Sequence, residues 1–142
     1  MPRIVRPMRF DNDGRPLVGS QSKCLGVRVP PNRHADIDLD NAGKVVLNRK
    51  GLSVSKDWRS LPPHLIPEHL DDGFNGASGK GMRVFVHGTG AFHEGPVSAG
   101  LELHHKLHSS ESGVLAPTGS VPMHQYQEDL AATRDGWVVD EG

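Results

Sequence analysis

Glycine and proline constrain the fold of this chain more than any other feature of its sequence. The 142 residues include 17 glycines and 11 prolines. Their combined share of the chain is well above the ~12% of average usage. Proline lacks a backbone donor, and glycine loses the most conformational entropy on folding, so both interrupt long helices and long strands. The composition therefore predicts short strands joined by many turns, not a helical bundle.

Length and charge narrow the class of protein further. A chain of this length is expected to form one domain with its own core. Its 16 basic and 17 acidic residues leave a net charge of -1, which gives no electrostatic reason to expect nucleic acid or an anionic membrane as partner. No apolar run approaches the ~20 residues of a membrane-spanning helix, and Cys24, the sole cysteine, excludes an intrachain disulfide. No apolar signal core follows Met1, so we expect a cytoplasmic protein, or one exported without a cleaved signal peptide.

The segment Val114–Val139 has the most regular pattern in the chain. It predicts a strand ended by a proline, a turn, the main helix over Met123–Arg134, and a final apolar segment that returns to the core. Within the helix, apolar or small side chains recur at i, i+3, i+7 and i+10, the spacing of one helical face: Met123, Tyr126, Leu130 and Thr133. Tyr126 and Leu130 are therefore expected to be buried.

Short strands are predicted before this helix. The segment Cys24–Val29 is apolar enough to be a buried strand, although Arg28 lies inside it. Alternating or apolar patterns predict further strands and one hairpin: Ile4–Val5 and Met8–Phe10 at a sheet edge, Ala35–Leu39 paired with Lys44–Leu47, Gly51–Ser55, Met82–Val86 and Leu101–Leu107. Residues 73–81 contain four glycines and are expected to form a mobile loop.

The predicted fold is α+β. It is a single domain with a short, curved or split antiparallel sheet and one main C-terminal helix. Residues 1–23 are interpreted as an N-terminal extension, and residues 24–142 as the domain.

Nine histidines raise the question of a metal site. If Leu101–Leu107 is a strand, His104 and His108 lie on one face but about 13 Å apart at ~3.3 Å per residue. A single zinc ion needs ligand atoms about 2.0–2.1 Å away, so these two side chains cannot share it. No metal ligand is assigned, although a histidine-rich metal-binding protein remains one alternative.

Several short motifs together resemble a known family. They are a glycine-leucine strand, a strand ending in a Gly-Thr turn, a strand ending in proline, and a helix that opens with methionine and carries tyrosine and leucine. The matching residues are Gly51, Leu52, Gly88, Thr89, Pro117, Met123, Tyr126 and Leu130. In these residues, over roughly 24–133, the chain resembles the small toxin effectors of bacterial type VI secretion, whose fold is similar to that of ADP-ribosyltransferases.

The resemblance implies a cleft that binds NAD. Members of the wider transferase fold place an arginine or histidine on the first strand, which here corresponds to Arg28, and a serine-bearing second strand, which here carries Ser53 and Ser55. Transfer of ADP-ribose also needs a carboxylate near the ribose to stabilise positive charge in the transition state. Many transferases carry a glutamate just before the strand that corresponds to Arg83–Phe85, but residues 80–82 are Lys, Gly and Met. No catalytic residue is therefore assigned.

Three functions follow as hypotheses. The first is a toxin-like domain that uses NAD to modify a target, for which the resemblance implies an immunity or antitoxin protein as partner. The second is a non-catalytic member of the same scaffold that binds a protein partner, which a flat apolar patch near Trp58 and Leu61 would favour. The third is an unrelated small α+β protein, including the histidine-rich metal binder.

Overall fold

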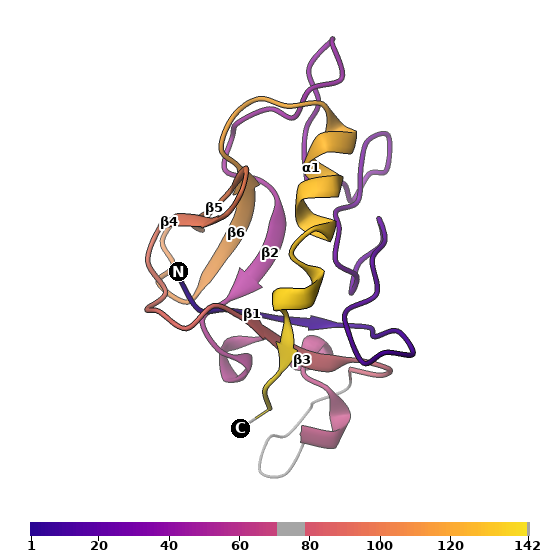
Figure 1. Cartoon of the computed structure of the whole chain (residues 1–142), viewed down its shortest axis with the longest axis vertical. Helices are drawn as coiled ribbons and strands as arrows, with labels where there is room; N and C mark the ends of the chain where they lie inside the picture. The colour runs from indigo at the N-terminus through magenta and orange to yellow at the C-terminus, as the bar shows by residue number, and fades with distance from the viewer. Residues whose placement is uncertain (71–78, 142) are drawn as a thin grey trace.

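The computed structural model describes residues 1–70 and 79–141, and it folds them into one sheet and one α-helix (Figure 1). Most of the glycine-rich segment expected to be mobile lies outside the described residues. In chain order, the strands and the helix are β1 (Ile4–Met8), β2 (Leu52–Ser55), β3 (Arg83–His87), β4 (Gly95–Ser98), β5 (Leu101–His105), β6 (Ser112–Pro117), α1 (Met123–Ala131) and β7 (Val138–Val139). Short 3-10 turns cover Trp58–Ser60, Pro63–Leu65, Glu68–Leu70 and Arg134–Gly136.

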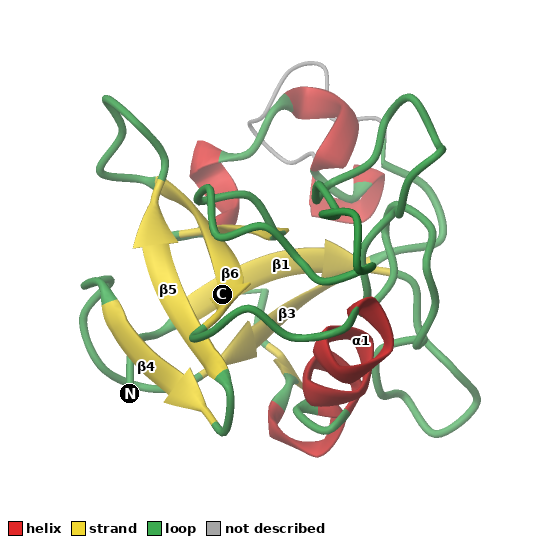
Figure 2. Ribbon diagram, turned by 90° about the horizontal axis from the view of Figure 1, so that it is seen from above, coloured by secondary structure: helices red, strands yellow, loops and turns green. Residues whose placement is uncertain are grey.

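The strands of the described chain form an antiparallel sheet in the order β4-β5-β6-β2-β1-β3-β7. The sheet consists of two half-sheets, one of β4, β5, β6 and β2 and the other of β1, β3 and β7. Within each half-sheet the strands pair along their length, but across the junction β1 and β2 share a single register pair, Val5 with Ser55. As a consequence, the two half-sheets run in different directions. Figure 1 shows this for β2, β5 and β6 against β1 and β3, and Figure 2 shows it for β5 against β1. The prediction of an α+β fold with a curved or split antiparallel sheet is confirmed.

Helix α1 covers the inner side of this curled sheet. Tyr126, Leu130 and Trp137 are each 0% exposed and belong to one buried cluster with side chains from both half-sheets. The burial predicted for Tyr126 and Leu130 is therefore confirmed. The helix ends at Ala131, earlier than predicted, and the chain continues into a 3-10 turn over Arg134–Gly136. At this point the Thr133 hydroxyl donates to the Leu130 carbonyl and accepts from the Trp137 indole N–H.

The N-terminal strand lies in the centre of the sheet and not at its edge, where the sequence had placed it. Strand β1 runs unbroken through Pro7 and lies between β2 and β3. Its side chains Ile4 and Met8 are 0% exposed. Residues 1–23, interpreted as an extension, thus contribute a core strand.

The segment Cys24–Val29 is buried as predicted, but it is not a strand of the sheet. Its backbone has one isolated bridge, between Leu25 and Val18. The N–H and C=O of Val27 instead pair with the side-chain amide of Gln127 on α1. Gly26 passes so close to Gly19 that an added Cβ would lie 1.9 Å from the Gly19 carbonyl oxygen, so the segment packs where a side chain would not fit.

Three further local predictions need correction. The hairpin predicted over residues 35–47 keeps its Asp40 turn, but only the isolated bridge between Leu39 and Val45 forms. The strand predicted over Leu101–Leu107 is shorter than expected, since β5 ends at His105 and Leu107 is 84% exposed. The final segment returns Trp137 to the core, whereas Val138 and Val139 lie at the exposed sheet edge.

His87 is a buried group that should make folding sensitive to pH. It is 7% exposed, its ring lies 5.4 Å from that of Trp137, and its Nδ1 atom has no hydrogen-bond partner in the described part of the chain. Burial lowers the pKa of His87 below the ordinary value of 6.5. As the pH falls through about 6.5, His87 becomes protonated in the unfolded chain but stays neutral in the native protein. The contribution of His87 to stability is therefore complete above pH 6.5 and is lost as the pH falls toward the lower native pKa.

We expect His87→Phe to flatten this dependence, because the aromatic volume remains and the titrating group is gone. The measurement is the free energy of unfolding by urea at pH 7.5 and pH 5.5. His124→Ala, an exposed change on α1, should keep the wild-type pH dependence. An unchanged slope in His87→Phe would show that His87 does not carry the effect.

Candidate functional site

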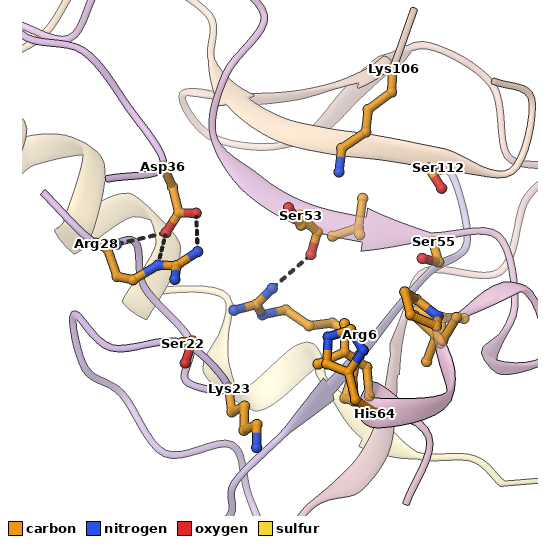
Figure 3. A pocket seen from close by; sticks show the side chains of 16 residues that line it. Arg6, Ser22, Lys23, Arg28, Asp36, Ser53, Ser55, His64, Lys106 and Ser112 are labelled. Carbon is orange, nitrogen blue, oxygen red and sulfur yellow. Dashed lines mark hydrogen bonds and ion pairs between the residues drawn. The ribbon is translucent and has the colours of Figure 1, made fainter. Parts of the chain in front are cut away.

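A pocket of about 400 Å³ opens where the two half-sheets separate. This volume is within the ~300–1,000 Å³ typical of small-molecule sites. The walls come from β1, β2, the loops after residues 21 and 35, the turns after β2, and the connection from β5 to β6 (Figure 3). The polar lining residues are Arg6, Ser22, Lys23, Arg28, Asp36, Ser53, Ser55, His64, Lys106 and Ser112.

The three residues assigned to cofactor binding from the sequence all line this pocket. Ser53 and Ser55 alternate along β2 with Leu52 and Val54, which belong to the main core. No hydrogen bond of either hydroxyl is found within the described part of the chain, and Ser53 is exposed whereas Ser55 is 8% exposed. Arg28 reaches the same pocket from the loop after Cys24, not from a strand as expected.

Arg28 is held by Asp36. The guanidinium Nε and Nη2 atoms donate to the two carboxylate oxygens at 3.2 and 3.0 Å, and the backbone N–H of Arg28 donates to the same carboxylate at 2.8 Å. The hydrogen bonds that Arg28 donates to Asp36, and then the charge of Asp36, raise the pKa of Arg28 against the effect of burial. The pair fixes the guanidinium in one orientation and neutralises much of its charge.

Arg6, in the middle of β1, is the cation that the sequence reasoning missed. Its Nη1 atom donates to the Ser53 carbonyl at 2.8 Å, while Nε and Nη2 donate to the Cys24 carbonyl at 3.2 and 3.0 Å. Within residues 1–70 and 79–141, no carboxylate forms an ion pair with it. Burial lowers the pKa of Arg6 to about 10, so it stays charged at neutral pH.

The geometry explains why Arg6 occupies this position. Because β1 and β2 pair only at Val5 and Ser55, the Ser53 carbonyl lacks a β1 partner in the ladder, and the Arg6 side chain supplies the donor. A guanidinium has five N–H donors, so some N–H groups of Arg6 remain available to bind a ligand. The signal in the sequence was a lone arginine inside the apolar run Ile4–Met8.

The pocket is electropositive. Among the described lining residues, Arg6, Lys23, Arg28 and Lys106 are basic, whereas Asp36 is the only carboxylate and is paired with Arg28. In Figure 3 the guanidinium groups of Arg6 and Arg28 extend toward each other, while the Lys23 side chain points away from them. Burial is the main cause of the lowered pKa of Arg6, and repulsion from Arg28 adds to it, whereas the charge of Asp36 acts in the opposite direction. An anion placed between the two guanidinium groups would relieve this repulsion.

The pocket lining supports catalysis less than it supports binding. No described glutamate lines it, and the Asp36 carboxylate already accepts three hydrogen bonds from Arg28. Within the described chain, no group of three or more His, Cys, Asp or Glu side chains is arranged to hold a metal ion. The arrangement can bind and orient an anion, but it offers no unengaged carboxylate as a general base.

Comparison of the chain with protein-family models, with curated proteins and with solved structures found no match. Over the described residues, no helix has both the length and the apolar character needed to cross a membrane.

Proposed function

We propose that this protein binds NAD or a related phosphate-bearing nucleotide in the pocket between the half-sheets. The observation that carries the proposal is the charged guanidinium of Arg6, which faces Arg28 and forms no ion pair among the described residues. Guanidinium groups offer planar sets of donors that match phosphate oxygens. The hydroxyls of Ser53 and Ser55 supply neutral donors and acceptors beside them.

The cellular role that we propose is that of a toxin on an ADP-ribosyltransferase-like scaffold, restrained by an immunity or antitoxin protein. This step rests on the resemblance of the sequence motifs. Binding has stronger physical support than ADP-ribose transfer, because the described lining offers only the engaged carboxylate of Asp36. The partner-binding alternative gains no support at the position named for it. Leu61 is 7% exposed, and Trp58 packs beside the cluster of Val5, Val84 and Val86.

Calorimetric titration with NAD, ADP and nicotinamide tests the proposal. NAD and ADP should bind because they carry phosphates, and nicotinamide alone should bind much more weakly. Measuring nicotinamide release from NAD in the same samples separates binding from transfer. Absence of NAD and ADP binding by the wild-type protein would refute the proposed function and leave partner binding as the better hypothesis.

Replacement of Arg28 gives a sharper prediction within this proposal. Arg28→Ala should weaken NAD binding about tenfold or more, since a charge-assisted hydrogen bond contributes about 1.5–3 kcal/mol. Arg28→Lys should restore only part of the affinity, because an ammonium cannot make a bidentate contact. Arg49→Ala is the control, since that guanidinium pairs with Glu94 outside the pocket. Equal binding by wild type and Arg28→Ala would remove Arg28 from the site.

A further inference from the structure

Gln127 connects α1 to the wall of the pocket without lining it. Its Oε1 atom accepts from the Val27 N–H at 3.1 Å, and its Nε2 atom donates to the Val27 carbonyl at 2.9 Å. A single amide thus satisfies both backbone groups of a residue 100 positions away. Because the Val27 side chain is 0% exposed and its segment pairs with no neighbouring strand, Gln127 takes the place of a strand at this point.

The residue after Val27 is Arg28, so this contact bears directly on the pocket. On its other side, the Arg28 backbone exchanges hydrogen bonds with Asp36: its N–H donates to the carboxylate, and its carbonyl accepts from the Asp36 N–H at 2.9 Å. Gln127 and Asp36 therefore hold two consecutive residues of a loop that lies outside the sheet. Gln127 connects the loop to α1, next to the buried Tyr126.

We propose that Gln127 is a positioning residue for the anion pocket, acting through the Val27 backbone to set where Arg28 presents its guanidinium. The effect of Gln127 on the affinity for NAD rests on the proposed function. The physical reason is that a binding group must be held within about 0.5 Å of its productive place by neighbours that are themselves fixed. Without the amide, the N–H and C=O of Val27 would lose their hydrogen-bond partner, and the loop would shift so that water could bind them.

Two variants and one control test this role. Gln127→Ala removes the side chain, and Gln127→Met removes the amide while keeping its volume and a good helix former. Each should raise the Kd for NAD about tenfold, a loss equivalent to about 1.4 kcal/mol. Gln125→Ala is the matched control, because among the described residues that amide donates to Asp129 of the same helix and not to the loop. It should leave the Kd unchanged.

A double-mutant cycle separates positioning from a general loss of stability. If Gln127 acts through Arg28, then Gln127→Met should add little to the Kd once Arg28 is already alanine. Additive effects of the two changes, or wild-type affinity in both Gln127 variants, would overturn the proposal. Arg28→Ala with wild-type affinity would do the same, because no positioned group would then contribute to binding.

Hydrogen exchange at the Arg28 amide provides a readout that needs no ligand. That N–H is bonded to Asp36 in the native state, and its exchange should be faster in both Gln127 variants than in Gln125→Ala. If the wild-type protein binds neither NAD nor ADP, the proposed function fails, while faster Arg28 exchange would still support the positioning role. Exchange at the wild-type rate in both Gln127 variants would contradict it.

Discussion

Arg6→Ala should reduce the affinity of the pocket for NAD more than any other single change to its lining. No described carboxylate forms an ion pair with Arg6, so a ligand phosphate can pair with its guanidinium directly. Loss of one such contact costs about 1.5–3 kcal/mol, or roughly 10- to 150-fold in Kd. Calorimetry at two ionic strengths is the measurement. The wild-type affinity should fall with added salt, and the affinity of the variant should fall less.

The same side chain also has a structural role, so the experiment needs two safeguards. Arg6 donates to the carbonyls of Cys24 and Ser53, and alanine leaves both without that donor. Arg6→Lys retains the charge and should bind with an affinity between those of wild type and Arg6→Ala. Arg3→Ala, three residues earlier and outside the pocket lining, should bind as wild type. A folded Arg6→Lys with wild-type affinity and a folded Arg6→Ala that also binds normally would together show that the ligand does not contact Arg6.

Local periodicity was a good guide wherever one element packs against the core by itself. The spacing of Tyr126 and Leu130 predicted their burial, and the alternation in β2 placed Ser53 and Ser55 opposite Leu52 and Val54. These two serines consequently lie together in the pocket. A pattern of period 2 or 3.6 records which side of an element is buried, and that information is local.

The remaining features depend on contacts between distant segments, which no local pattern records. Cys24–Val29 has the composition of a buried strand, and it is buried, but its backbone partner is the Gln127 amide. The sequence predicted two separate edge strands, Ile4–Val5 and Met8–Phe10, yet β1 runs through Pro7 in the centre of the sheet. Arg6 was missed for the same reason, because its importance arises only where β1 and β2 separate.

The second large effect that we expect is a loss of stability in Leu130→Ala. Leu130 is 0% exposed and lies in a cluster with Ile4 and Met8 of one half-sheet and Leu52 and Leu115 of the other. Removing a buried leucine side chain leaves a cavity and costs about 2–5 kcal/mol. Denaturation with urea should show a lower midpoint. Glu128→Ala, an exposed change on the same helix, should stay within about 0.5 kcal/mol of wild type.

The same experiment tests what joins the two halves of the sheet. Since β1 and β2 share one register pair, ladder hydrogen bonds contribute little across the junction, and the core beneath α1 must hold the halves together. Leu130→Ala should therefore weaken both halves at once, and unfolding should remain a single transition with an unchanged m-value. Two separate transitions in the variant would show that each half-sheet is stable without the helix, and a midpoint equal to that of wild type would show that Leu130 does not pack as described.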